Sequence, residues 1–243
     1  MAHLTEKHHA ILFACIAEKV INEIGEKNGG PLLRRAVLEY GRQRGKRMAM
    51  RALNNGHDLT MDNYLAYCEW RVPKDAMEIR FLTKNPHARV NIFKCPWHSI
   101  WEEHNLIKYG KYFCMEIDAA LVKGFNPDLE IEIHSTRTNG GGLCDFVFKG
   151  ARLSLFNALF LLYKKKIRPG KSAVMPWSYH TAHLYKTMGV LIKKELGSRA
   201  DGIIQGALSC FSSFFSKTDA AEVTKLQDID FEKLPEFDVS ESV

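Results

Sequence analysis

Residues 94–148 decide the fold: KCPWHSIWEEHNLIKYGKYFCMEIDAALVKGFNPDLEIEIHSTRTNGGGLCDFVF. The segment begins with two helix-like stretches and ends with two strand-like stretches. Candidate functional side chains lie along it: Cys95, Cys114, Cys144, Asp118, His98 and His104. We therefore expect a ligand site or a reaction centre within it, with the rest of the chain forming its walls.

The strand-like segments of the chain predict one antiparallel sheet. Alternating or β-branched apolar residues cover 76–82, 89–93, 129–133 and 143–148. Turn residues at Asn85-Pro86 and at the glycine run after Asn139 join them in pairs. The order strand, strand, helix, helix, strand, strand indicates an α+β fold whose four-stranded antiparallel sheet, about residues 76–148, is covered by helices.

Two helices are predicted between the strand pairs. Pro96 suits the first position of a helix that runs to about His104. A further helix is expected over 108–123, ending at Gly124. Cys114 and Asp118 are four residues apart on it, so they would project from one face.

Helical hairpins are predicted at both ends of the chain. Apolar residues recur at helical spacing over 4–24, and a second helix starts near Pro31 after a turn in the EKNGG segment. Residues 178–215 return to helix. The stretches 8–25 and 180–197 have the same length and both end in glycine, which is compatible with a repeat or with chance similarity of amphipathic helices.

Three further expectations concern the remaining segments. Gly41 and Gly45 are one helical turn apart and would let another backbone approach closely. An apolar helix is predicted over 153–166. We expect residues 1–225 to form a single α+β domain and residues 226–243 to be an acidic, flexible tail.

The composition is that of an ordinary globular protein, with 46% hydrophobic and 26% charged residues among 243. The net charge of +6 is scattered, and we find no nucleic-acid motif. One basic cluster is read as a solvated helix face in preference to an anion site; its members are Arg42, Arg44, Lys46, Arg47 and Arg51.

The sequence predicts a cytoplasmic protein that does not enter a membrane, because it shows neither a secretion signal nor a membrane-spanning apolar run. In that compartment the six cysteines are expected to be free thiols, ligands or nucleophiles rather than disulfides. We expect a small-molecule substrate, no nucleic-acid partner and no cofactor, and the sequence permits a homo-oligomer.

Cys95 is the first candidate for chemistry. It stands just before Pro96 at a helix start, where free backbone N–H groups and the helix dipole favour a thiolate. His98 lies in the first turn and could exchange a proton with it. The competing interpretation is a small buried residue at a strand-helix junction.

Further candidates lie nearby. Asp118 beside Cys114 could act as a general base or bind an amidine, or it could only make a helix-surface hydrogen bond. Cys144 shares the apolar face of its strand with Phe146. Convergence of Cys95, Cys114 and Cys144 on zinc is an alternative, but none of them lies in a CxxC pair, and we predict no metal.

The motifs CPW, YFC with a following aspartate, GFNP and the final CDF resemble the L-2-amino-thiazoline-4-carboxylic acid hydrolase family, together with the run GRQRGKRMAMRA. The resemblance covers most of the chain. It implies hydrolytic opening of a cyclic amidine-thioether that carries a carboxylate, giving N-carbamoyl-L-cysteine.

Roles can be assigned on this basis. Attack on the amidine carbon gives a tetrahedral intermediate from which the ring sulfur leaves. Candidate catalytic residues are Cys95 as nucleophile, His98 as proton carrier, Asp118 as the group that binds or activates the amidine, and Cys114. Candidate substrate-binding residues are Arg47 as carboxylate clamp, Trp97, Cys144 and Asn126. The alternative is a binding or sensor module with a layout similar to vinyl-reductase domains.

Overall fold

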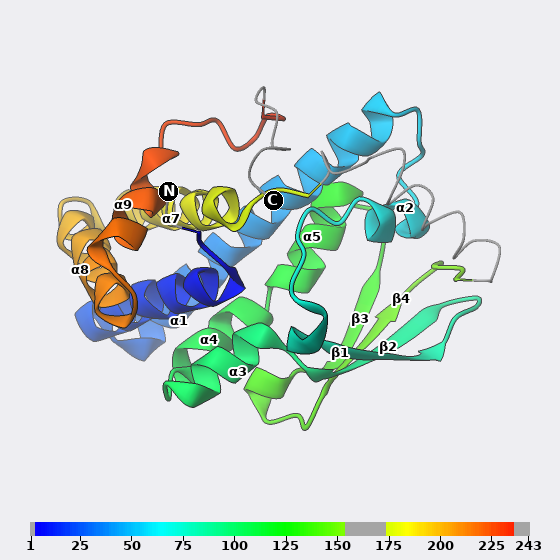
Figure 1. Ribbon diagram of the computed structural model, residues 1–243, viewed down its shortest axis with the longest axis horizontal. Coiled ribbons are helices and arrows are strands. Elements are labelled where there is room, and N and C mark those ends of the chain that lie inside the picture. The colour runs from blue at the N-terminus through cyan, green and yellow to red at the C-terminus, as the bar shows by residue number, and fades with distance from the viewer. Residues whose placement is uncertain (1–2, 154–173, 236–243) are drawn as a thin grey trace. The chain divides into compact units, whose positions relative to one another are not determined.

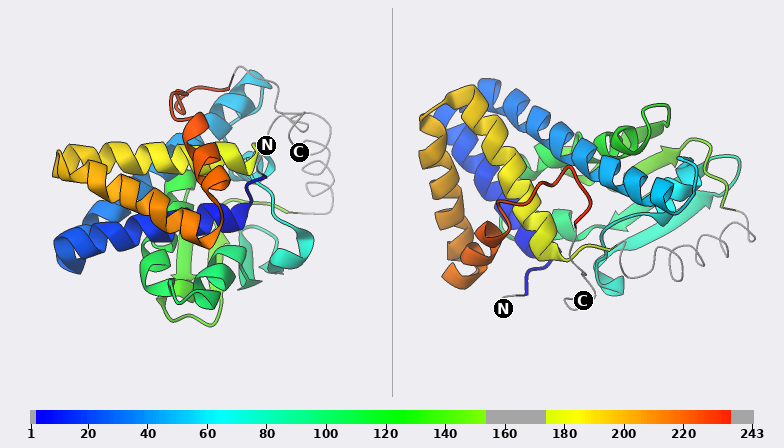
Figure 2. Two further views of the ribbon diagram at one scale, coloured as in Figure 1. Left: turned by 60° about the vertical axis from the view of Figure 1, so that its left-hand side comes forward. Right: turned by 90° about the horizontal axis from the view of Figure 1, so that it is seen from above.

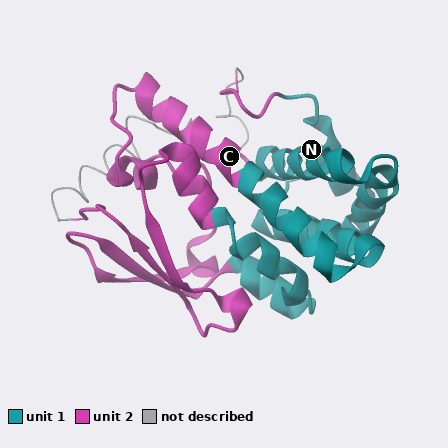
Figure 3. Cartoon of the chain, turned by 180° about the vertical axis from the view of Figure 1, so that it is seen from behind, with its two compact units in different colours: residues 1–40, 96–117, 177–229 teal, residues 41–95, 118–176, 230–243 magenta. Residues whose placement is uncertain are grey.

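The structure is a computed structural model that describes residues 3–153 and 174–235 (Figure 1). Its helices and single sheet confirm the predicted α+β class. The chain forms two compact units, each built from separate pieces of sequence (Figure 3). Unit 1 contains Met1–Tyr40, Pro96–Ile117 and Trp177–Ile229, and unit 2 contains Gly41–Cys95, Asp118–Pro176 and Asp230–Val243.

The sheet belongs to unit 2 and has the strand order β1-β2-β4-β3, with every neighbouring pair antiparallel. Its strands are β1 (Glu78–Thr83), β2 (Ala88–Lys94), β3 (Ile131–Ser135) and β4 (Cys144–Phe148). Each lies within a few residues of a predicted strand, so the alternation of apolar residues identified the sheet correctly. Phe146 pairs with Val90 on one side and with Ile133 on the other, so their side chains share the apolar face.

Short helices pack on that apolar face. They are α2 (Met61–Ala66), which is N-capped by Thr60, and α5 (Ile117–Phe125). The Tyr64 ring lies 5.7 Å from the Phe125 ring and 6.4 Å from the Phe148 ring, measured between centroids. Two 3-10 turns complete the described part of the unit, η1 (Lys74–Ala76) and η2 (Arg137–Asn139).

Unit 1 contains the two predicted helical hairpins (Figure 2). The first is made by the part of α1 (Glu6–Asn54) that belongs to unit 1, where the chain reverses at Gly25 with φ of 75°. The second joins α7 (Trp177–Leu196) to α8 (Arg199–Phe214) through Gly197, where φ is 59°. Both reversals use a glycine in the left-handed region, as the matched ends of the two sequence stretches indicated. Unit 1 also contains α9 (Lys217–Lys225).

Two predicted helix boundaries are wrong. The helix of α1 resumes directly after Gly25, so no separate turn fills the EKNGG segment and Pro31 lies inside the helix. The helix expected over 108–123 is two helices, α4 (Ile107–Cys114) and α5, which follow α3 (Pro96–Glu103). The Glu116 N–H donates to the Phe113 carbonyl three residues back, which tightens and ends α4.

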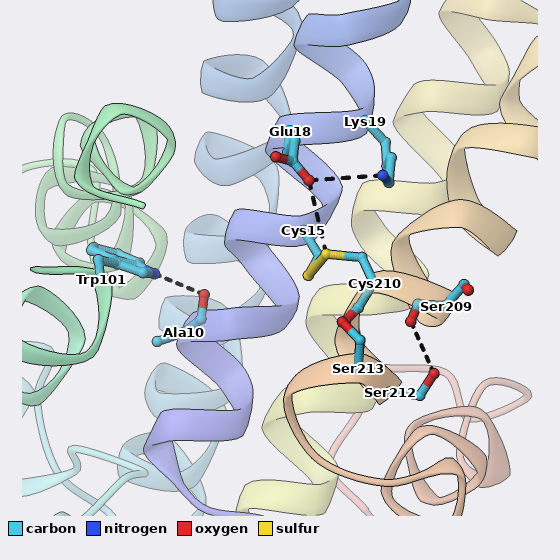
Figure 4. The surroundings of a disulfide bond; sticks show 9 residues. All are labelled: Ala10, Cys15, Glu18, Lys19, Trp101, Ser209, Cys210, Ser212 and Ser213. Carbon is cyan, nitrogen blue, oxygen red and sulfur yellow. Dashed lines mark hydrogen bonds and ion pairs between the residues drawn. A yellow bond between two sulfur atoms is a disulfide. The ribbon is translucent and has the colours of Figure 1, made fainter. Parts of the chain in front are cut away.

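A disulfide corrects the expectation that the cysteines form no disulfides. Cys15 on α1 and Cys210 on α8 are bonded, with Cα atoms 5.8 Å apart (Figure 4). They are separated by 195 positions in the sequence, so spacing gave no indication of the pair. The disulfide joins the two hairpins of unit 1 covalently, and the other four cysteines are not in disulfides.

Some predictions fall partly or wholly outside the described residues. The apolar helix predicted at 153–166 lies outside the described residues except for residue 153. The end of the predicted tail, residues 236–243, also lies outside them. Within the described part of that tail, Phe231 is buried. None of the helices that the structure describes is long and apolar enough to cross a membrane.

In unit 2, α1 and α5 cross with their backbones in contact. A Cβ atom on Gly45 would overlap the Leu121 carbonyl oxygen and lie 2.5 Å from the Phe125 nitrogen. A Cβ on Gly124 would overlap the Arg42 carbonyl oxygen. Close approach was predicted for Gly45 and is confirmed, and it brings this part of α1 against the helix that carries Asp118.

Replacement of Gly45 by alanine should lower the free energy of unfolding by about 3 kcal/mol or more, because the new methyl group meets backbone that cannot move aside. Urea unfolding measures this effect. Gly142→Ala is the matched control, since no described heavy atom lies within 4 Å of a Cβ there, and it should change stability by less than about 1 kcal/mol. Equal effects of the two substitutions would contradict the proposed contact.

Candidate active site

A buried carboxylate on the loop after α2 binds three arginines of α1. Arg44 Nε and Arg47 Nη2 donate to Glu69 Oε1 at 3.1 and 2.7 Å. Arg51 Nη1 donates to Glu69 Oε2 at 2.8 Å. Successive spacings of three and four residues place the arginines on one helix face. Glu69 is 0% exposed, and a charge so placed needs close partners, so the cluster fixes this loop to α1.

The interpretation of the basic cluster as a solvated helix face is therefore wrong for these three arginines, which are all buried. It fits Lys46 better, which makes a partly exposed ion pair with Glu232 at 3.0 Å. Arg47, the predicted carboxylate clamp, donates through Nη2 to Glu69 and through Nη1 to the Phe231 carbonyl. These bonds use both terminal nitrogens of Arg47. Its role as a carboxylate clamp for a substrate stays a prediction.

Asp118 is a half-buried carboxylate near the start of α5. Burial among protein atoms raises its pKa to about 6, and the positive charge of Arg44 only partly opposes this. A carboxyl with this pKa gains and loses its proton close to neutral pH. It therefore suits a general acid or base, the role that the sequence suggested for it.

The charge of Asp118 acts on two neutral groups, the Tyr64 phenol and the Cys144 thiol. The pKa of the Tyr64 phenol is raised well above its usual value, first by burial and then by the charge of Asp118. Burial also raises the pKa of the Cys144 thiol, although the Arg137 N–H donates to its Sγ at 3.4 Å and opposes the shift. Cys144 is therefore a protonated thiol near neutral pH, which suits contact with a ligand better than nucleophilic attack.

The prediction that Cys114 and Asp118 share a helix is wrong. Cys114 is the last residue of α4 in unit 1, whereas Asp118 belongs to α5 and unit 2. Glu116, between them, is buried and accepts a hydrogen bond from Arg34 Nε within unit 1. Cys95 is half-buried and stands directly before Pro96, the first residue of α3, as predicted.

His98 and Trp97 lie in the core of unit 1. Trp97 Nε1 donates to His9 Nδ1 at 3.2 Å, so the other nitrogen of His9 carries the proton shared with Tyr40 Oη at 2.9 Å. His98 Nδ1 lies 3.9 Å from a carboxylate oxygen of Glu102. Trp97 thus has a structural role, and its contact with a substrate stays a prediction.

Asn126 closes the end of α5. Its Nδ2 donates to the Leu59 carbonyl at 2.9 Å, and its Oδ1 accepts from the Asp128 N–H at 2.9 Å. The side chain therefore holds two loops of unit 2 together. Substrate binding by Asn126 is untested, and it would add to this structural role.

Sequence reasoning missed Glu69, Tyr64 and Arg137. The helical spacing of the three arginines carried a signal for a shared partner, but nothing in the sequence around Glu69 identified it. Over residues 3–153 and 174–235, no three His, Cys, Asp or Glu side chains come close enough to hold a metal ion. Cys95, Cys114 and Cys144, the ligands of the zinc alternative, form no such group there.

Comparison with known proteins gives a family match. The protein-family model for L-2-amino-thiazoline-4-carboxylic acid hydrolase matches residues 5–148, more than half of the chain. The matched region includes Asp118, Cys144 and Glu69. No curated protein and no solved structure matches the chain.

Substitution of Glu69 by glutamine should lower the free energy of unfolding by about 3–5 kcal/mol, because it removes the negative charge that three buried guanidinium groups share. Urea unfolding is the measurement. Glu78→Gln is the control, since Glu78 pairs with Arg80 on the surface, and it should cost less than about 1 kcal/mol. A similar loss in both variants would contradict the importance of the cluster.

Asp118→Asn should instead stabilise the protein at neutral and higher pH. Because its folded pKa of about 6 lies above the ordinary value of 3.8, the carboxyl favours folding below its ordinary pKa and loses that contribution as pH rises through 6. Asparagine avoids this loss. In urea unfolding we therefore expect the free energy of unfolding to rise by about 1–3 kcal/mol near pH 8, with no difference from the unmodified protein near pH 4.

Asp145→Asn should change the free energy of unfolding in the opposite direction in the same urea experiment. Hydrogen bonds from Arg89 lower the pKa of Asp145, so its ionised form contributes stability above the ordinary pKa and this is lost on acidification. Asparagine should therefore destabilise at neutral pH. If Asp118→Asn also destabilised near pH 8, the assigned environment of Asp118 would be wrong.

Proposed function

Because the chain belongs to the L-2-amino-thiazoline-4-carboxylic acid hydrolase family, we propose that it hydrolyses a small cyclic amidine-thioether carboxylate such as L-2-amino-thiazoline-4-carboxylate. The product is N-carbamoyl-L-cysteine. The observation that supports this most is Asp118, a half-buried carboxyl with a pKa of about 6 whose charge acts on the Cys144 thiol and the Tyr64 phenol.

Asp118 has the chemistry that ring opening needs. Its ionised form accepts hydrogen bonds from the two nitrogens of the amidine and takes a proton from the attacking water. The water oxygen bonds to the ring carbon between nitrogen and sulfur, giving a tetrahedral intermediate. The carbon–sulfur bond then breaks as the carbonyl forms, and the hydroxyl proton of the intermediate passes to the amidine nitrogen that was doubly bonded. The sulfur leaves as a thiolate and accepts the proton from Asp118. One water is added overall, and the carboxylate is restored.

Cys95 provides a covalent form of the same reaction. Its thiolate attacks the same ring carbon, the ring sulfur leaves, and water then cleaves the new carbon–sulfur bond and releases Cys95. The position of Cys95 just before α3 supports a thiolate there. For this form the sequence suggests His98, three residues further along the chain, as the proton carrier. Both routes give the same products, so variants must separate them.

Purified protein incubated with the aminothiazoline carboxylate should release one thiol for each N-carbamoylcysteine formed, measured by chromatography. The rate should rise with pH through about 6 as Asp118 ionises. Asp118→Asn should lower kcat by about 100-fold or more. Asp128→Asn, which removes an exposed carboxylate just after α5, is the control and should retain the rate.

The same assay separates the alternatives. Cys95→Ser should lose turnover if the thiolate attacks, and retained turnover would assign the attack to water. Saturable binding of the substrate without product, across pH and with added metal ions, would contradict the hydrolase proposal. That outcome would favour a binding module.

A further inference from the structure

Two polar groups in the turn before Cys144 have no hydrogen-bond partner in the part of the chain that the structure describes. They are Arg137 Nε and Thr138 Oγ1, and both atoms are buried. The residues are neighbours in η2, the turn that precedes β4, and Thr138 is 7% exposed. A buried donor without an acceptor costs about 1–3 kcal/mol. Two of them in neighbouring residues make this turn a candidate for contact with an acceptor group on a ligand.

The chain holds Arg137 in a fixed position. Its Nη1 donates to the Phe93 carbonyl at the end of β2, and its backbone N–H donates to Cys144 Sγ at 3.4 Å. The turn itself is closed by the Gly141 N–H, which donates to the Thr136 carbonyl at 3.1 Å. A guanidinium held in this way loses little freedom when it binds an anion.

Cys144 lies in β4, on the face of the sheet that α5 covers, and two groups of opposite charge act on its thiol. The negative charge of Asp118 raises the pKa of its thiol, and the positive charge of Arg137 lowers it. Both groups are therefore close enough to Cys144 to affect it. A ligand in contact with this thiol would meet a carboxylate from α5 and a guanidinium from η2.

We propose that Arg137, together with Thr138, binds the carboxylate of a substrate whose amidine binds Asp118, with Cys144 between them. This rests on the proposed function and assigns the carboxylate to a residue other than Arg47, whose terminal nitrogens donate to Glu69 and Phe231. An aminothiazoline carboxylate has a basic amidine and a carboxylate on opposite sides of a small ring, which matches two opposite charges. The site selects for ligands that carry both groups.

Binding of an inert probe tests the assignment independently of turnover. The probe is 2-aminothiazole-4-carboxylate, whose aromatic ring resists opening, and its affinity is measured by calorimetry. Arg137→Gln should weaken binding about 10- to 100-fold, and Arg137→Lys less, because lysine retains the charge without the planar donors. The matched control is Arg80→Gln, which removes an exposed arginine from β1 and should bind like the unmodified protein.

A second probe isolates the carboxylate. The neutral 2-aminothiazole should bind the unmodified protein and Arg137→Gln equally, because it lacks the group that Arg137 contacts. Thermal unfolding checks that each variant is folded. Equal affinity of the carboxylate probe for both proteins, or no binding to the unmodified protein, would overturn the proposal. Arg137-dependent binding without thiol release from the true substrate would support this site while contradicting the hydrolase proposal.

Discussion

The carboxylate of Glu69 accepts hydrogen bonds from three arginines of one helix face, and these bonds fix the loop after α2 to α1. Each arginine alone would be costly to bury, but the shared anion offsets that cost and fixes their side chains. Arg44 also acts on Asp118 through its charge. The cluster that stabilises the unit thus contributes to the field at the candidate catalytic carboxylate.

Two aspartates of unit 2 show how environment separates structural from reactive groups. Asp145 accepts two hydrogen bonds from Arg89, and its pKa is lowered. For Asp118 burial outweighs the nearby charge, so its pKa is raised. A fold that keeps such a carboxyl gives up stability at neutral pH, as expected where the group serves chemistry.

Local sequence patterns predicted the elements but not their long-range partners. Alternation located the strands, and glycines at the ends of similar helical stretches located both reversals in unit 1. No glycine or proline marks the break after Cys114, which is accompanied by burial of Glu116 against Arg34. The partner of the arginine face and the bond between Cys15 and Cys210 depend on tertiary contacts that spacing does not encode. Asp118 was found because it shares a motif with Cys114, although the predicted common helix was wrong.

The disulfide also determines how the chain carries mechanical load. Cys15 and Cys210 are near the two ends of the sequence, and residues 41–176, with the sheet and the candidate site, lie between them. A force applied at the termini passes through the sulfur bridge from one hairpin to the other. The enclosed segment is therefore shielded from stretching until the bridge is reduced, and a single backbone cut within it leaves both pieces covalently joined.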